Sequence, residues 1–173
     1  MQSLRKALEL AHEALTNAGV DHALIGGMAL GGLGVHRATA DVDLLIEGEK
    51  RNIAKQFLLS AGFVLVQETE EVLHFKGVGF LDLLLARREA TRNMLRNAVL
   101  LPPLGIKCVS AEDIIGLKIQ AYRNDPRREL QDKADIAAVI RQNPGLDWNK
   151  VRMYADLFDE WPAMEKMRET YGL

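Results

Sequence analysis

The sequence predicts an α+β fold in which helices flank a mixed β-sheet and the C-terminal part of the chain is helical. Three observations predict it. Short, strongly apolar runs such as Phe80–Leu85 have the length and composition of strands. Longer segments with apolar residues at helical spacing lie between these runs. After Val109, helical segments follow one another without a strand between them.

The length and composition suit a compact protein. A chain of 173 residues with 48% hydrophobic content can bury a proper core. We expect a core over residues 1–109 and a helical C-terminal part over residues 110–173 that packs on the core as a cap, or one single domain.

The first half of the chain alternates helices and strands. A helix is expected over Ser3–Ala18, because its apolar residues share one face, and Gly19 ends it. A strand at Ala23–Ile25, a glycine turn and a short helix at Met28–Leu33 follow. After the strand with Asp41 and Asp43, we expect one helix and three strands: Lys50–Ala61, Phe63–Gln67, Glu71–Lys76 and Phe80–Leu85.

The second half is mostly helical. Pro102 to Gly105 is typical of a turn, here between strands at Ala98–Leu101 and Ile106–Val109. Ser110 predicts a helix start, since an acid stands at the third helical position after it. The expected helices are Arg87–Asn97, Ala111–Arg123, Glu129–Arg141, Trp148–Phe158 and Pro162–Tyr171.

Two aspartates, Asp41 and Asp43, stand one residue apart in an apolar run. A strand places side chains i and i+2 on the same face, so they should project together about 7 Å apart. An unpaired carboxylate on a half-buried strand is costly, and a divalent cation would offset that cost. Mg²⁺ prefers such oxygen ligands, usually together with substrate phosphates.

A third acid, Asp82, lies in the later run FLDLLL. If its strand lies beside the strand of Asp41 and Asp43, three carboxylates converge, which suits two metal ions about 4 Å apart in phosphoryl or nucleotidyl transfer. Asp82 is then also the candidate general base. The alternative is structural: Asp41 caps or ends its strand while Asp43 pairs with a nearby arginine.

The glycines before the acids fit no mononucleotide fingerprint, since no G-x-G-x-x-G and no G-K-S/T can be drawn through them. Gly26 and Gly27 instead predict a turn into a short helix whose backbone N–H groups face phosphate oxygens. Arg37 and Thr39 precede the acids, where a guanidinium can contact a triphosphate. A loop arginine paired with a surface acid is the alternative for Arg37.

Other site chemistries find no support. The four histidines show no paired spacing typical of zinc: His12, His22, His36 and His74. Cys108 is the only cysteine, so an internal disulfide is impossible, which is consistent with a reducing compartment. No run of eighteen apolar residues occurs and the N-terminus does not resemble a signal peptide, so we expect a cytoplasmic protein without a membrane partner.

The order Gly26-Gly27, Asp41-Val42-Asp43 and Asp82 resembles the nucleotidyltransferase superfamily of DNA polymerase β type. Within it, the segments Arg37–Leu45 and Val109–Ile140 are similar to AbiEii-like bacterial proteins, which include toxins of toxin–antitoxin pairs.

This resemblance implies a nucleotidyltransferase-type sheet and a metal-dependent enzyme. It would move a nucleoside monophosphate from an NTP such as ATP to a hydroxyl or phosphate, with two Mg²⁺ ions, or Mn²⁺ in their place, and release pyrophosphate. The acceptors that it implies are an RNA end, a protein side chain or a small molecule. The AbiEii-like segments favour a toxin-like role, with a cognate antitoxin as partner.

The same resemblance implies that Lys118 contacts the nucleotide and that Asp132 and Asp135, in a K/R-D-x-x-D pattern, have an accessory role in activity. The usual leading basic residue is Gln131 here. The structural alternatives are a lysine that extends its ammonium into water and first-turn acids that complement the helix dipole.

Two other functions stay open: a binding protein of this fold that acts through a partner without catalysis, and kinase-like phosphoryl transfer. A formal charge of −2 and a pI near 6.1 do not favour a dedicated nucleic-acid binder. Six arginines form either a local basic patch or solvated helix faces balanced by acids: Arg88, Arg92, Arg96, Arg123, Arg127 and Arg128.

Overall fold

The computed structural model describes residues 2–102 and 105–172, which form two compact units. The first unit combines Met1–Ala29 with Ala38–Val109, and the second combines Leu30–Arg37 with Ser110–Leu173. The domain division expected after Val109 stays a prediction, because grouping by contacts does not show that either unit folds alone.

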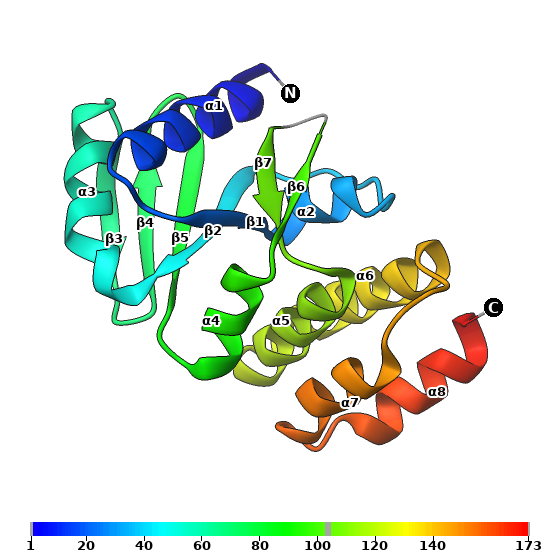
Figure 1. Ribbon diagram of the computed structural model, residues 1–173. Coiled ribbons are helices and arrows are strands. Elements are labelled where there is room, and N and C mark those ends of the chain that lie inside the picture. Colours follow the sequence, from blue (N-terminus) through cyan, green and yellow to red (C-terminus); the bar gives the residue numbers. More distant parts are fainter. Residues whose placement is uncertain (1, 103–104, 173) are drawn as a thin grey trace. The chain divides into compact units, whose positions relative to one another are not determined.

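The first unit is built on a seven-stranded mixed sheet with the order β3-β4-β5-β2-β1-β7-β6 (Figure 1). β2 pairs with β5 in parallel and with β1 antiparallel, and β4 pairs antiparallel with both β3 and β5. β7 pairs in parallel with β1 and antiparallel with β6. The strands are β1 (His22–Ile25), β2 (Asp41–Glu47), β3 (Val64–Glu68), β4 (Val72–Lys76), β5 (Phe80–Ala86), β6 (Val99–Leu101) and β7 (Ile106–Cys108).

Alternation along the central strands creates two different faces of the sheet. Val42 and Leu44 of β2 are fully buried, as are Leu81 and Leu83 beside them on β5. The acids Asp41, Asp43 and Asp82 occupy the alternate positions and are only partly buried. α1 (Gln2–Asn17) contacts β2 and β5 and packs on α3 (Arg51–Ser60). The sequence therefore gives this sheet one apolar face and one acidic patch.

α2 (Gly26–Gly32) begins directly after β1, two residues earlier than the helix expected at Met28–Leu33. Gly26 has a φ of +63°, a conformation that side-chain-bearing residues rarely adopt. The strand-to-helix change therefore takes place at Gly26 itself, without a separate glycine turn.

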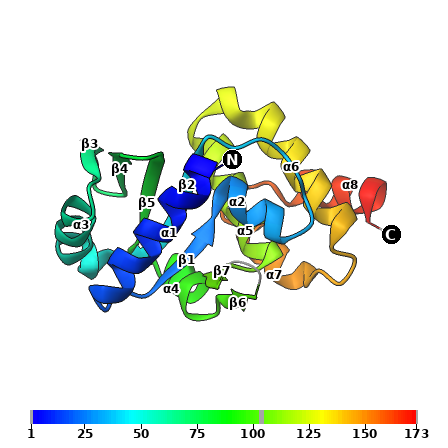
Figure 2. The ribbon, with the colours of Figure 1, turned by 90° about the horizontal axis from the view of Figure 1, so that it is seen from above.

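The second unit contains the helices of the C-terminal part. α5 (Ala111–Asn124) packs on α6 (Glu129–Gln142) and α7 (Trp148–Asp156), and α8 (Trp161–Tyr171) contacts α6 and α7. The predicted start of α5 is confirmed: Ser110 Oγ accepts from the Asp113 backbone N–H, and Asp113 Oδ2 accepts from that of Ser110. This reciprocal cap satisfies two donors that the helix cannot pair internally. Figure 2 shows these helices in colours from the yellow-green of α5 to the red of α8.

The structure confirms the α+β class with a mixed sheet, and it corrects some boundaries. The helix expected over Arg87–Asn97 is α4 (Glu89–Arg96), because Arg88 is extended, with φ −90° and ψ 152°. A 3-10 turn, Gly48–Lys50, precedes α3. The tip of the turn expected at Pro102 to Gly105, residues 103–104, lies outside the described residues. No helix in the described ranges combines the length and apolar character needed to span a membrane.

Candidate active site

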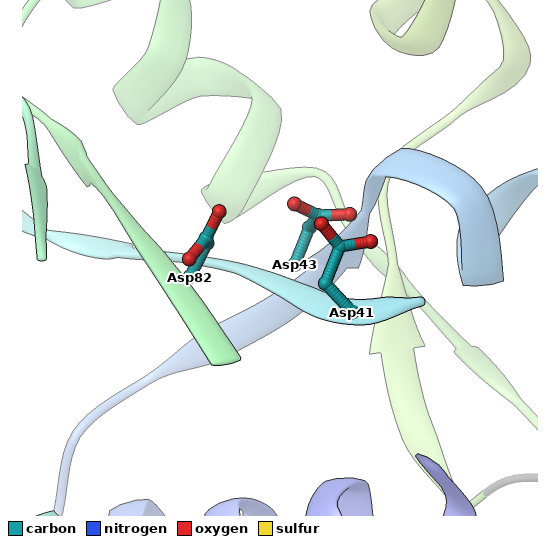
Figure 3. Close-up of side chains that lie close together, drawn as sticks. All are labelled: Asp41, Asp43 and Asp82. Carbon is teal, nitrogen blue, oxygen red and sulfur yellow. The ribbon is translucent and has the colours of Figure 1, made fainter. Parts of the chain in front are cut away.

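The three predicted acids meet on the first unit's sheet. Asp43 and Asp82 are direct partners in the parallel ladder of β2 and β5, and Asp41 lies two residues before Asp43 on the same face. One oxygen from each carboxylate lies within 4.8 Å of the other two. Figure 3 shows the three side chains on one side of the sheet, with α1 in dark blue on the other side. The expected convergence is therefore present.

Three carboxylates at this separation repel one another when ionised, and each is only partly withdrawn from water. Their oxygens are hard ligands of the kind that Mg²⁺ and Mn²⁺ prefer. The donor set therefore fits a divalent cation, whose charge would offset the repulsion.

Asp41 and Asp43 each lie against a residue outside their own strand. The Thr39 hydroxyl donates to Asp41 Oδ1 at 3.0 Å. Gly26 lies so close to Asp43 that a Cβ at residue 26 would overlap the carboxylate, and a Cβ at Gly27 would overlap the Thr39 hydroxyl. The two glycines thus leave the space in which Asp43 and Thr39 lie.

Asp82 has a partner that the sequence did not predict. His74 Nδ1 lies 2.7 Å from Asp82 Oδ1, and the two residues are direct partners in the antiparallel ladder of β4 and β5. The sequence held part of the signal, since Gly77 and Gly79 predict a tight connection between the two strands. The register that brings the two side chains together, with Lys76 paired with Phe80, is given by the structure. Histidine spacing typical of zinc sites does not identify a cross-strand pair of this kind.

The remaining predicted site residues lie in the second unit, as a buried charge network. Lys118 Nζ lies 2.8 Å from Asp132 Oδ1 and 2.6 Å from Asp135 Oδ2. All three residues are buried, with relative exposures of 6%, 1% and 3% respectively. Arg37 Nε lies 3.2 Å from Asp135 Oδ2, and Arg128 Nε lies 3.1 Å from Asp132 Oδ2.

This network contradicts the structural alternatives for Lys118 and Arg37 and agrees in part with the one for the two acids. The Lys118 ammonium does not extend into water. Asp132 does lie in the first turn of α6, as the helix-dipole alternative expects, whereas Asp135 lies beyond it. Arg37 pairs with a buried acid rather than a surface one. Gln131, which stands where a basic residue is usual in the AbiEii-like pattern, donates from Nε2 to Asp135 Oδ1 at 2.9 Å. The amide of Gln131 thus contributes to the network without adding charge.

The six arginines considered as a basic patch each have an acidic partner. Arg88 pairs with Glu71, Arg92 with Glu49 and Arg96 with Glu89. In the second unit, three more pairs follow the same rule: Arg123 with Glu160, Arg127 with Asp125 and Arg128 with Asp132. These pairs support the account of helix faces balanced by acids.

Comparison with known proteins gives structural matches without sequence matches. No protein-family model matches the chain, and no curated protein matches it at a significant level. The solution structure of the antibiotic-resistance factor ANT(2'')-Ia is similar, with a TM-score of 0.71 and 18% identity over 96% of this chain and 97% of that one. A crystal structure of ANT(2'')-Ia in complex with adenylyl-2''-tobramycin has a TM-score of 0.70 and 19% identity, over 90% of this chain and 96% of that one.

Two further structures are less similar. An antigenic nucleotidyltransferase-like protein from Paracoccidioides brasiliensis gives a TM-score of 0.57 and 22% identity over 98% of this chain and 93% of that one. The lincosamide antibiotic adenylyltransferase LnuA, lincomycin-bound, has a TM-score of 0.56 and 16% identity, over 80% of this chain and 95% of that one. At these identities the likeness concerns the fold. The chain therefore has the fold of the nucleotidyltransferases.

Proposed function

We propose that this protein is a metal-dependent nucleotidyltransferase that moves a nucleoside monophosphate from an NTP to an acceptor. The observation that carries the proposal is the meeting of Asp41, Asp43 and Asp82 on neighbouring parallel strands, with one oxygen of each within 4.8 Å of the others. A protein that only binds a partner has no need for three converging carboxylates. The nucleotidyltransferase fold of the chain supports the same function.

The three acids would hold Mg²⁺, or Mn²⁺ in its place. Asp41 and Asp43 would bind two ions, and Asp82 would bind one of them. When bound, such ions neutralise charge on phosphate oxygens and favour loss of the proton from an acceptor hydroxyl. The supporting observation is the donor set itself, three oxygen ligands that otherwise repel one another.

Asp82 is proposed as the general base. Its carboxylate would take the proton of the acceptor hydroxyl while the hydroxyl oxygen forms a bond to the α-phosphorus of the NTP. The bond from the α-phosphorus to the bridging oxygen breaks, and pyrophosphate leaves. Asp82 suits this role because its side chain is 28% exposed, so an acceptor can reach it.

Gly26 and Gly27 are proposed to position the phosphates. The supporting observation is that both glycines lie directly against residues of the acid site, Asp43 and Thr39. Any side chain at these positions would take up that space. Thr39 is proposed to act on the nucleotide site through Asp41, to which its hydroxyl donates.

In the second unit, Lys118 and Arg37 are proposed to neutralise charge on the nucleotide, with Asp132 and Asp135 as accessory residues. The structure adds a condition to this proposal. Lys118 is held between two buried carboxylates, so it would contact a phosphate only by giving up part of that pairing. Its role in stability and its role in binding must therefore be measured separately.

A hydroxyl of a small molecule is the acceptor class that we place first. ANT(2'')-Ia and LnuA, which share this fold, were solved with an adenylylated antibiotic and with an antibiotic respectively. The acidic partners of the six arginines and the formal charge of −2 do not favour a polyanionic acceptor. RNA ends and protein side chains, the targets of a toxin-like enzyme, remain as outcomes of the test.

The test uses NTPs labelled at the α-phosphate with Mg²⁺ and three separate acceptor pools: small molecules, total RNA and total protein. The proposal expects label in one pool, with release of pyrophosphate, and no label with the Asp41→Asn/Asp43→Asn variant. Transfer of a γ-label with loss of a single phosphate would instead show a kinase. A wild-type chain that neither binds NTP with Mg²⁺ nor labels any pool would indicate a binding protein.

A further inference from the structure

A histidine outside the acid triad contacts one of its members. His74 lies at the middle of β4 and Asp82 at the corresponding position of β5, so their side chains share one face of the sheet. Asp82 is in turn the ladder partner of Asp43. The three side chains form a row across adjacent strands, in the order His74, Asp82, Asp43.

The 2.7 Å separation between His74 Nδ1 and Asp82 Oδ1 defines the chemistry of the contact. An ionised carboxylate only accepts hydrogen bonds, so the proton between the two atoms belongs to the imidazole. Nδ1–H therefore donates to Oδ1. The partner of a histidine nitrogen determines which nitrogen carries the proton, so a neutral His74 is the Nδ1–H tautomer.

This contact completes a pattern in the acid site. Each of the three acids has a neighbour that limits its rotation: the Thr39 hydroxyl on Asp41, the backbone of Gly26 against Asp43, and the imidazole of His74 on Asp82. The terminal torsion of an aspartate is otherwise broad, so the strand alone does not fix the plane of its carboxylate.

The core does not require a histidine at this position. Its neighbours on β4, Leu73 and Phe75, are buried in the apolar layer with exposures of 0% and 1%. The His74 side chain lies on the other face and is 38% exposed. A partly exposed polar contact of this kind contributes little to stability, as is found for exposed pairs of charged groups. Substitution of His74 should therefore change the acid site while leaving the fold intact.

We propose that His74 is a positioning residue for Asp82. Its Nδ1–H holds Oδ1 in place and thereby fixes the direction of the second oxygen, which serves the metal and the acceptor proton. The inference rests on the proposed function of Asp82. Ligands of metals are commonly oriented by such outer hydrogen bonds, and loss of one lowers metal affinity or activity by roughly 10- to 100-fold.

Three substitutions of His74 separate positioning from packing. In His74→Asn the amide nitrogen takes the place of Nδ1, in His74→Gln it lies one atom further out, and His74→Ala has no donor. We expect Mn²⁺ affinity, measured by titration calorimetry, to fall roughly tenfold or more in the Ala and Gln variants and to stay within about threefold of wild type in the Asn variant. In nucleotidyl transfer, kcat should likewise fall in the Ala and Gln variants and stay near the wild-type value in the Asn variant, with little change in KM for the NTP.

A spectroscopic measurement tests the contact without activity. In the ¹⁵N spectrum of the imidazole at pH 8, His74 of the wild-type protein should carry its proton on Nδ1, and in Asp82→Ala it should shift toward the Nε2–H form that free histidine prefers. The same His74 tautomer in the wild-type protein and in Asp82→Ala would overturn the inference. So would a His74→Ala variant that binds Mn²⁺ as tightly as wild type while Asp82→Asn no longer binds Mn²⁺. If Asp82→Asn itself binds Mn²⁺ as wild type does, the proposed function of Asp82 fails, and the tautomer still decides whether His74 holds its carboxylate.

Discussion

Gly26 lies directly against the carboxylate of Asp43, so close that a methyl group on Gly26 would overlap it. The same glycine has a φ of +63° at the point where β1 turns into α2. Two separate requirements, backbone conformation and space, therefore meet at one residue next to the proposed metal site.

Gly26→Ala should lower the affinity of the acid site for Mn²⁺ by roughly 10- to 100-fold, because the new methyl group displaces Asp43. The strained φ adds about 1–2 kcal/mol of destabilisation. Calorimetric titration with Mn²⁺ and urea unfolding measure the two effects.

Gly19→Ala is the matched control for this substitution. Gly19 has a φ of +64°, and a Cβ there would meet no described heavy atom within 4 Å. The Gly19→Ala variant should therefore show the destabilisation from the strained φ alone and bind Mn²⁺ as wild type does. Equal affinities in the two alanine variants would contradict the role given to Gly26.

Asp82→Asn should make the metal-free protein more stable, because it removes one charge from a group of three carboxylates. Asp82 makes two such like-charge pairs, and each repels by about 1 kcal/mol in a water-like dielectric. Loss of both, about 2 kcal/mol together, corresponds to a rise in Tm of roughly 4–8 °C. The same variant should lose most of the stabilisation that Mg²⁺ gives the wild type.

Thermal unfolding with EDTA and with Mg²⁺ measures both effects of Asp82→Asn. Glu9→Gln removes one negative charge from an exposed pair with Arg5 on α1 and should change neither value. A lower metal-free Tm for Asp82→Asn would show that the three acids do not repel one another as their separation implies.

Much of the acid site could be predicted from the sequence, because a strand fixes the relation between residues i and i+2. Asp41 and Asp43 therefore share a face before any tertiary contact is known. The position of Asp82 depends on which strand lies next to β2, and apolar runs alone do not determine strand order. The contact between His74 and Asp82 also needs the register of a hairpin, and a shift by one residue would move His74 to the other face.

The charge network of the second unit could not be predicted in the same way. Lys118 on α5 and Asp132 and Asp135 on α6 meet through the packing of two helices, and local spacing sets no distance between their side chains. The start of α5 could be predicted, because the contacts between Ser110 and Asp113 are local in the chain. Contacts between residues that are neighbours in the chain can thus be predicted from the sequence.

Lys118→Met should destabilise the protein by about 3–5 kcal/mol, because it removes the ammonium between two buried carboxylates. The triple variant Lys118→Met/Asp132→Asn/Asp135→Asn removes those charges together and should recover much of the stability. Urea unfolding of both variants measures the difference.

Titration of the same variants with ATP and Mg²⁺ tests the nucleotide-binding role of Lys118. If Lys118 contacts a phosphate, the triple variant stays more than about tenfold weaker in binding although its stability has recovered, since one hydrogen-bonded charge is worth that much. Wild-type affinity in the triple variant would assign Lys118 to stability alone.

The stability of the first unit should fall in mild acid because of His22. Burial lowers the pKa of His22 below the ordinary histidine value of about 6.5, and the neighbouring His12 lowers it further. As the pH falls below about 6.5, the unfolded chain therefore binds more protons than the folded one. The free energy of unfolding decreases over this pH range.

His22→Asn should reduce this pH dependence. Its amide can replace Nδ1, which lies 2.8 Å from the Val20 carbonyl oxygen, but it does not titrate. Urea unfolding at pH 7.5 and pH 5.5 should show a smaller difference in the variant than in wild type. The same difference in both proteins would mean that another group is responsible.

Asp41, Asp43 and Asp82 are proposed to share divalent metal, and binding of Mn²⁺ in the presence of a non-hydrolysable NTP analogue measures whether they do. The signal of free Mn²⁺ in electron paramagnetic resonance reports how many ions each chain removes from solution. We expect saturable binding of two ions by the wild-type protein, and loss of that binding in Asp41→Asn/Asp43→Asn. The same uptake of Mn²⁺ by the wild type and the double variant would show that these acids do not hold the metal.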